Sequence, residues 1–129
     1  MPATQSPTIT LRLPWPPSAN KYRICARGRW FLSAKGQQYH CDVEAIVADE
    51  LGVPCVPLSG RLGVSIEAVM PDRRRRDLDN MQKIILDSLQ ACRVFENDFQ
   101  IDDLRIKRLH VEPPGCVDVC IQELTAAGE

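Results

Sequence analysis

Residues 61–91, RLGVSIEAVMPDRRRRDLDNMQKIILDSLQA, change their hydrophobic period partway along. The first part alternates, which predicts a strand over 61–70 whose apolar face collects Leu62, Val64, Ile66, Ala68 and Met70. Apolar residues then recur at helical spacing, which predicts an amphipathic helix over about 78–91 on a stripe of Leu78, Met81, Ile85, Leu89 and Cys92. The two elements are therefore joined by a strongly charged connection that holds four arginines and two aspartates.

Hydrophobic periodicity and turn residues also predict the strands and helices of the rest of the chain. Alternation over 8–13 predicts a half-buried strand, and a glycine turn joins two short extended pieces within 22–32. Ser33 can cap a helix over about 34–50, which Gly52 ends. The alternating segments DLRIKRLHVE and VDVCIQEL are joined by PPG and predict an antiparallel hairpin. The last residues, TAAGE, should fray.

This order of elements, β-β-β-α-β-α-β-β, predicts an α+β fold in which two main helices pack on a mixed sheet. The 129 residues contain no repeat or linker, so we expect a single domain over 1–129. No apolar run is long enough to span a bilayer, and the N-terminus lacks the features of a signal peptide. We therefore expect a cytoplasmic protein without a membrane partner, whose six cysteines stay reduced and do not form a structural zinc site.

The formal net charge of -1 conceals an uneven distribution of charge. Residues 1–41 carry basic side chains and no acidic one, whereas residues 112–129 carry acidic side chains and no basic one. A polyanion responds to local potential, so a nearly neutral protein with basic segments can still bind one. For the N-terminal set, a solvated surface with chance clustering is an equal alternative.

Asp77 and Asp79 are one residue apart, where the strand has ended and the helix begins. If the chain is extended through Asp79, both carboxylates can aim at one cation, and oxygen ligands favour Mg²⁺ or Mn²⁺. The structural alternative makes Asp77 a helix cap and pairs Asp79 with Lys83 one turn later. The four preceding arginines favour a functional role, because cations oppose the helix dipole there unless an anion is drawn in.

A third carboxylate is available beyond the helix, and the sequence leaves its identity open. Asp98 lies in FENDFQ, and Asp102 and Asp103 compete with it. The helix is about 21 Å long, so the following loop has to carry any of them back to the pair. Lys83 is a catalytic residue in one interpretation and an ordinary surface lysine in the other.

These residues together resemble the RusA family of Holliday junction resolvases. The segment RRRRDLDNMQKIILDSLQACRVFENDFQIDDLRIKR is similar to the family's D-x-D-N-x-x-K helix, its D-x-Q-I loop and its basic strand, and LPWPPSANKYR is similar to the family's start. The resemblance covers about residues 9–111. It implies a homodimeric, Mg²⁺-dependent endonuclease, with no organic cofactor, that makes paired nicks in four-way DNA junctions. The family is common in phages and prophages.

The resemblance also implies a role for each matching residue. The metal ligands and catalytic carboxylates would be Asp77, Asp79 and Asp98, and Lys83 would contact the scissile phosphate. Asn97 stands where the family usually has a further acid. Backbone phosphates, which position DNA without reading its sequence, would be held by Arg73, Arg74, Arg75, Arg76, Lys21, Arg23 and Lys107.

Two rival functions stay open at this point. One is a metal-dependent nuclease of flaps, replication forks or RNA, and the other is a non-catalytic DNA-binding or interaction module whose carboxylates are caps and salt bridges. The sequence also does not tell whether LPWPPSANKYR shapes the site or only turns the chain. It leaves the dimer surface, the number of metals and the cleavage preference undefined, and Trp15 and Trp30 are equally suited to the core and to a base.

Overall fold

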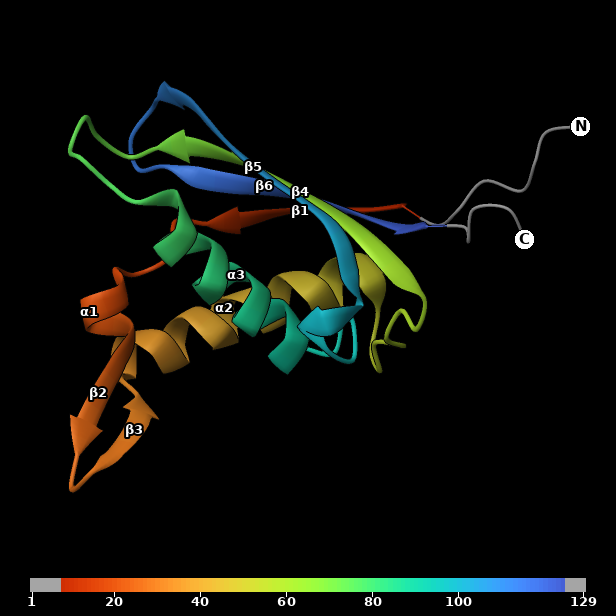
Figure 1. Cartoon of the computed structure of the whole chain (residues 1–129), viewed down its shortest axis with the longest axis horizontal. Coiled ribbons are helices and arrows are strands. Elements are labelled where there is room, and N and C mark those ends of the chain that lie inside the picture. The colour runs from red at the N-terminus through yellow and green to blue at the C-terminus, as the bar shows by residue number, and fades with distance from the viewer. Residues whose placement is uncertain (1–7, 125–129) are drawn as a thin grey trace, which may run out of the picture.

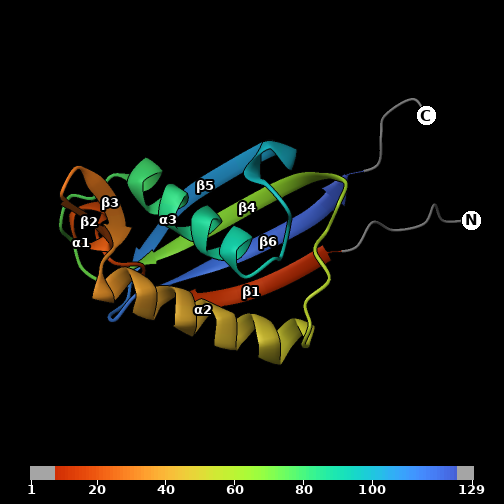
Figure 2. The same ribbon diagram turned by 90° about the horizontal axis from the view of Figure 1, so that it is seen from below.

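The computed structural model describes residues 8–124, which form a four-stranded sheet with two long helices on one face, as Figures 1 and 2 show. The termini, 1–7 and 125–129, lie outside the described residues, and the predicted fraying of TAAGE with them. The elements in chain order are β1 (Thr8–Pro14), α1 (Ala19–Tyr22), β2 (Arg23–Ala26), β3 (Arg29–Leu32), α2 (Ala34–Leu51), β4 (Arg61–Met70), α3 (Leu78–Ala91), the 3₁₀ turn η1 (Asp98–Gln100), β5 (Ile101–Val111) and β6 (Cys116–Leu124).

The main sheet has the strand order β1-β6-β4-β5 and is mixed. β4 runs parallel to β5, whereas β6 is antiparallel to both of its neighbours, β1 and β4. The predicted α+β class and element order are therefore confirmed. Two short elements, α1 and η1, are additions that the periodicity of the sequence did not predict. No helix among residues 8–124 is long and apolar enough to cross a membrane.

The predicted hairpin between the last two strands is wrong, because β4 lies between them. The connection after β5 passes over the end of β4, where the Glu112 N–H donates to the Met70 carbonyl oxygen at 2.8 Å. Gly115 lies against Pro71 with φ +83, a position that leaves no room for a side chain. β4 is buried along most of its length and needs a neighbour on each edge, so the two strands separate to flank it.

The helices form where the sequence predicts them and for the predicted reasons. The Ser33 side chain accepts a hydrogen bond from the Gly36 N–H at 3.0 Å and caps α2. Gly52, with φ 89, ends the same helix. The core between the helices and the sheet includes, from α2 and α3, the buried side chains Tyr39, Val43, Val47, Met81, Ile85 and Leu89.

The strands β2 and β3 form a separate two-stranded sheet that extends away from the main sheet, at the lower left of Figure 1. Its base is fixed to the body at Ser33, whose backbone N–H donates to the Tyr22 carbonyl oxygen at 2.9 Å. Gly36 packs so closely against that carbonyl that a Cβ atom would lie 2.4 Å from the oxygen. The first turn of α2 therefore holds both α1 and the hairpin in place.

Candidate active site

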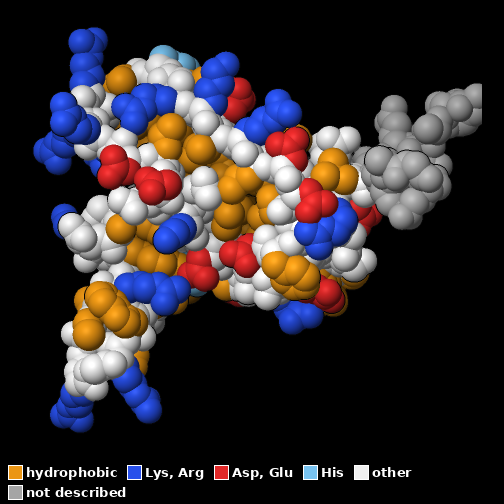
Figure 3. All heavy atoms as spheres, in the orientation of Figure 1, with side chains coloured by type: hydrophobic (Ala, Val, Ile, Leu, Met, Phe, Trp, Pro, Cys, Tyr) orange, Lys and Arg blue, Asp and Glu red, His pale blue; other side chains and the backbone are white. Residues whose placement is uncertain are grey.

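The exposed face of α3 carries a polar stripe, defined here as Asp79, Lys83, Asp87 and Gln90, which follow one another at helical spacing. The opposite face supplies apolar side chains to the core, so α3 is fixed in rotation and the stripe is held outward. Figure 3 shows this face of the molecule, with acidic side chains over α3 and basic side chains gathered beside them on the neighbouring loop and on the hairpin.

Most aspartates in residues 8–124 have partners, and those that lack one are informative. Asp72, Asp87, Asp102, Asp103 and Asp118 each form an ion pair with an arginine, and Asp42 accepts a hydrogen bond from Gln38. Within the described chain, no hydrogen bond or ion pair engages the side chains of Asp49, Asp77, Asp79 and Asp98. Three of these four are the carboxylates that the sequence proposed as metal ligands.

The structural alternative for Asp77 and Asp79 is not realised in the described residues. Asp77 occupies the N-cap position of α3 in an extended conformation, yet its side chain accepts no capping hydrogen bond. Asp79 lies in the first turn, and no ion pair joins it to Lys83. Both carboxylates and the Lys83 ammonium group are exposed and free to meet a ligand.

The competitors of Asp98 are both engaged. The Arg61 Nη2 atom lies 2.5 Å from Asp102 Oδ1, and this hydrogen-bonded pairing lowers the pKa of the Asp102 carboxyl. Arg105 pairs with Asp103 at 3.3 Å. Asp98 is thus the one carboxylate of the three without a partner among residues 8–124, and it is the best candidate for the third ligand.

Asp98 is held by the residue two positions later. Gln100 is buried, and its amide oxygen accepts from the backbone N–H groups of Glu96 and Asn97, both at 2.9 Å. Its amide nitrogen donates to the carbonyl oxygens of Leu58 and Gly60. This explains the glutamine in the D-x-Q motif: it fixes the turn that presents Asp98.

Asp77 lines a cavity of about 260 Å³ between the start of α3 and residues 15–20. The residues PWPPSAN therefore shape the site as well as turning the chain. Trp15 is half-buried in the wall of this cavity, and the Arg76 guanidinium carbon lies 5.7 Å from the centre of its ring. The first tryptophan thus supports the arginine-rich loop and is not a free surface residue.

Lys83 and Asp98 line a second, larger cavity of about 610 Å³. Arg23 from β2 and Asp87 from α3 line the same cavity. Asn80, which the sequence reasoning did not single out as a site residue, lines both cavities and so connects the Asp77 side with the Asp98 side. Nothing in the hydrophobic pattern distinguishes Asn80, although it belongs to the D-x-D-N-x-x-K motif.

A single chain does not gather the three carboxylates at one point. Among residues 8–124, no three His, Cys, Asp or Glu side chains lie close enough together to hold a metal ion. The Asp98 N–H donates to the Gln90 side chain at 3.1 Å, and Gln90 is about 16 Å along the helix axis from Asp79. The chain supplies Asp77 and Asp79 at one end of α3 and Asp98 towards the other.

The four arginines before α3 do not have the same environment. Arg73 and Arg75 are exposed and have no side-chain partner within the described residues. The backbone N–H of Arg74 donates to Asp72, whereas the Arg76 guanidinium pairs with Asp72 at 2.8 Å. These contacts lower the pKa of the Asp72 carboxyl. Arg76 is therefore a structural anchor, and the preceding three arginines remain candidates for binding phosphate.

The other residues predicted to bind DNA lie on both faces of the main sheet, the one that carries the helices and the one without helices. Lys21 is exposed on α1, while Arg23 is engaged with Asp87 at 3.1 Å. Lys107 lies opposite Glu67 in the parallel ladder, one residue after Ile106, which packs against the core, so Lys107 projects from the face without helices. Arg108, which no sequence signal distinguished, donates to the Arg76 carbonyl oxygen at 2.6 Å and holds the arginine-rich loop.

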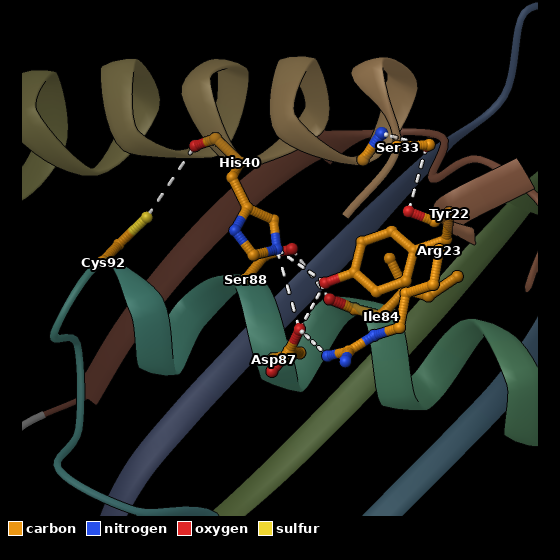
Figure 4. A network of polar contacts seen from close by, with 9 residues as sticks. Tyr22, Arg23, Ser33, His40, Ile84, Asp87, Ser88 and Cys92 are labelled. Atoms are coloured by element: carbon orange, nitrogen blue, oxygen red, sulfur yellow. Dashed lines mark hydrogen bonds and ion pairs between the residues drawn. The ribbon is translucent and has the colours of Figure 1, made fainter. Parts of the chain in front are cut away.

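Tyr22, His40, Asp87 and Arg23 form a polar network beside the second cavity, as Figure 4 shows. The Tyr22 hydroxyl donates to Asp87, and its oxygen lies 2.6 Å from His40 Nε2. Burial, with the Asp87 hydrogen bond, raises the pKa of the Tyr22 phenol well above its usual range. Burial also lowers the pKa of His40, although Asp87 opposes that change. No sequence motif pointed to this network.

The fold and these side chains together define a class of protein. It is an α+β domain that presents unpaired carboxylates beside unpaired arginines, an arrangement suited to holding a cation close to a phosphate group.

Comparison with known proteins gives the family. Residues 14–122 match the family model described as endodeoxyribonuclease RusA. The chain is 38% identical over 117 residues to the crossover junction endodeoxyribonuclease RusA of Escherichia coli strain K12, of Shigella sonnei strain Ss046 and of Enterobacteria phage 82. These alignments cover 91% of this chain and 96% of each relative. The chain therefore belongs to the RusA endodeoxyribonuclease family, which confirms the resemblance found in its motifs.

Proposed function

We propose that this protein is a Mg²⁺-dependent endonuclease of the cytoplasm that nicks four-way DNA junctions symmetrically during recombination and repair. The observation that carries the proposal is that Asp77, Asp79 and Asp98 are unpaired within residues 8–124 of a chain of this family, with unpaired arginines directly before Asp77. The relatives' name, crossover junction endodeoxyribonuclease, supports a branched DNA substrate.

The donor set fits a hard divalent cation. All candidate ligands are carboxylate oxygens, and those of Asp77 and Asp79 are exposed and unpaired within the described residues. Such ligands favour Mg²⁺, which Mn²⁺ can replace, over softer metals. When bound, the ion would supply a Lewis acid for the scissile phosphate and for the attacking water. No organic cofactor is required for this chemistry.

The third carboxylate reaches the site through a homodimer in this proposal. The turn that carries Asp98 is fixed by the four hydrogen bonds of buried Gln100, so it does not swing along α3 towards Asp79. A second copy of the chain can bring its own Asp98 without that movement. A two-fold dimer would then have two sites, which suits the near two-fold symmetry of a four-way junction.

The remaining side chains position the phosphate. The exposed Lys83 ammonium group, one turn after Asp79, would contact the scissile phosphate and stabilise the charge that develops on it. Arg73, Arg74 and Arg75 hold backbone phosphates on the side of Asp77. Lys21 extends this basic surface onto α1. These contacts orient the DNA but do not read its sequence.

The experiment that tests the function compares cleavage of a synthetic four-way junction, a flap, a fork, a linear duplex and RNA, all with Mg²⁺. We expect symmetric paired nicks in the junction and slow cutting of the other substrates. Equal cutting of flaps or forks would contradict the junction assignment while leaving the metal chemistry in place. Binding without any cutting would instead favour a non-catalytic DNA-binding module.

A further inference from the structure

The β2–β3 hairpin exposes large apolar side chains. Trp30 is 67% exposed, Ile24 51% and Phe31 46%. The hairpin extends away from the helices and the main sheet, and Figure 3 shows hydrophobic side chains uncovered along it. Apolar surface that is concentrated on one projecting element indicates a binding site more often than a scattered exposed residue does.

The apolar side chains lie on both faces of this hairpin. Trp30 pairs with Cys25, and Phe31 pairs with Ile24. Because side chains alternate along a strand, Trp30 projects from one face and the Phe31–Ile24 pair from the other. A hairpin that docked on a protein surface would need only one apolar face. Two apolar faces suit insertion between two flat surfaces, such as neighbouring base pairs.

The charge of the hairpin fits a polyanion. Arg27 and Gly28, with φ 54 and 76, make the tight turn at its tip, so that Arg27 and Arg29 lie directly beside the apolar residues. Residues 1–41 contain no acidic side chain. The charged side chains of the hairpin itself are thus all cations, which is typical of elements that bind bases and the phosphates that flank them.

The base of the hairpin is continuous with the candidate active site. Arg23 begins β2, pairs with Asp87 of α3 and lines the cavity that also contains Lys83 and Asp98. Ser33, at the other end of the hairpin, is bonded to Tyr22 through its backbone and its side chain. The hairpin therefore extends outward from the site on a fixed base, with an exposed tip.

We propose that the β2–β3 hairpin is a wedge that inserts at the branch point of the DNA substrate. Trp30 stacks on the base on one side, Phe31 and Ile24 contact the base on the other, and Arg27 and Arg29 hold the adjacent phosphates. The inference rests on the proposed function, because a four-way junction supplies base pairs at a branch point that open more readily than those of a duplex.

The test uses a four-way junction with 2-aminopurine at the branch point and the full chain without divalent metal, so that no cleavage occurs. The intact protein should raise the 2-aminopurine fluorescence, because the base becomes unstacked. The double variant Trp30→Ala/Phe31→Ala should not raise it and should bind the junction about tenfold more weakly. Trp30→Phe, which keeps an aromatic ring, should restore most of the signal.

The matched control is Val56→Ala, which removes an 82% exposed apolar side chain in the 52–60 loop, at the other end of the molecule from the hairpin in Figures 1 and 2. It should behave as the intact protein does. Circular dichroism checks that the double variant is folded. If it is unfolded, the same fluorescence measurement is made on Trp30→Ala alone, because the Trp30 side chain is mostly solvent-exposed and its removal should not unfold the protein.

The outcomes separate this inference from the function on which it rests. In one outcome, the intact protein cuts junctions with Mg²⁺ while the double variant unstacks the branch point as well as the intact protein does. This result would overturn the wedge but would support the nuclease function. Sedimentation without DNA compares the oligomeric states of the two proteins. If the intact protein is a dimer and the double variant a monomer, the hairpin is a subunit interface, and the wedge is overturned. An intact protein that cuts no junction would overturn the proposed function itself.

Discussion

At the scale of single residues, Asp77 occupies a helix N-cap without acting as a cap. An aspartate in that position commonly bonds a backbone N–H of the first turn, which contributes about 1 kcal/mol to stability. Asp77 leaves this contribution unused, and its carboxylate remains available to a ligand. Asp79 likewise leaves Lys83 unpaired. Asp77 could make a capping hydrogen bond and Asp79 could pair with Lys83, yet neither contact is made. Side chains that bind a ligand are expected to leave such local contacts unmade.

The arginines before α3 give a prediction that separates binding from anchoring. Arg73→Ala with Arg75→Ala should weaken binding to every DNA tested and reduce the slope of log K against log salt by about 2, because two phosphate contacts are lost. The preference among sequences should not change. The measurement is a salt titration of junction binding by fluorescence anisotropy.

Arg76→Ala is the matched comparison for that pair, since Arg76 is bonded to Asp72 and packs on Trp15. It should mainly lower the midpoint of thermal unfolding. A salt slope that stays unchanged in the Arg73/Arg75 variant, or that falls only in the Arg76 variant, would contradict the assignment of these roles.

The candidate site could be predicted from the sequence only in part. The D-x-D pattern indicated Asp77 and Asp79, and the family resemblance implied Asp98 as the third carboxylate. The residue pattern by itself could not choose Asp98 over Asp102. That choice depends on Arg61, which lies in a different strand and engages Asp102 in the folded chain. Ion pairs between residues distant in sequence leave no periodic signal, so the free and paired carboxylates look alike before folding.

At the scale of elements, β5 and β6 show the limit of local signals. Two alternating runs joined by PPG have the same pattern whether the strands pair directly or flank a third strand. The deciding factor is β4, whose burial requires neighbours on both edges. Helix α2 was predicted well because its Ser33 cap and its apolar stripe are contained in its own sequence, and α3 was predicted well from its apolar stripe.

The turn η1 depends on Gln100, which leads to a second prediction. Gln100→Leu keeps the size of the side chain but leaves two backbone N–H groups and two carbonyl oxygens without partners. The free energy of unfolding should fall by about 2 kcal/mol or more, measured by urea denaturation. Junction cleavage should fall with it, because Asp98 is no longer held.

Gln37→Leu is a suitable control, because exposed Gln37 makes one side-chain bond, to the Leu32 carbonyl oxygen. Its effect should be small. An unchanged urea midpoint in Gln100→Leu would show that the hydrogen bonds of Gln100 do not hold the turn.

The network around His40 predicts a dependence of stability on pH. Burial lowers the pKa of His40 below its usual 6.5, so the folded protein keeps the imidazole neutral at a pH where the unfolded chain has protonated it. As the pH falls below about 6.5, the free energy of unfolding should therefore decrease. Thermal unfolding between pH 7 and pH 5.5 measures this change.

His40→Gln removes the titrating group and should unfold at a midpoint that varies less over the same pH range. The carboxylates titrate in both proteins, so the difference between the two curves isolates His40. Parallel curves would mean that the imidazole does not carry the dependence.

At the scale of the whole molecule, the separation of Asp98 from Asp79 predicts that two copies share each site. Asp79→Asn and Asp98→Asn should each be inactive alone. In a mixed dimer with one copy of each variant, one site holds both substitutions and the other holds none. Mixing the two inactive proteins should therefore restore single nicks in a junction. No activity after mixing, with dimer exchange verified, would place all three carboxylates in one chain.

The role of the unpaired carboxylates is tested most directly by Mg²⁺-dependent cleavage of a four-way junction, measured for Asp79→Asn and Asp49→Asn. Asp49 is the matched control, because it is also exposed and unpaired within residues 8–124 but lies on α2. We predict that Asp79→Asn lowers the cleavage rate by about a thousandfold or more while junction binding persists, and that Asp49→Asn cuts normally. Normal cutting by Asp79→Asn, or loss of junction binding together with cutting, would contradict the account.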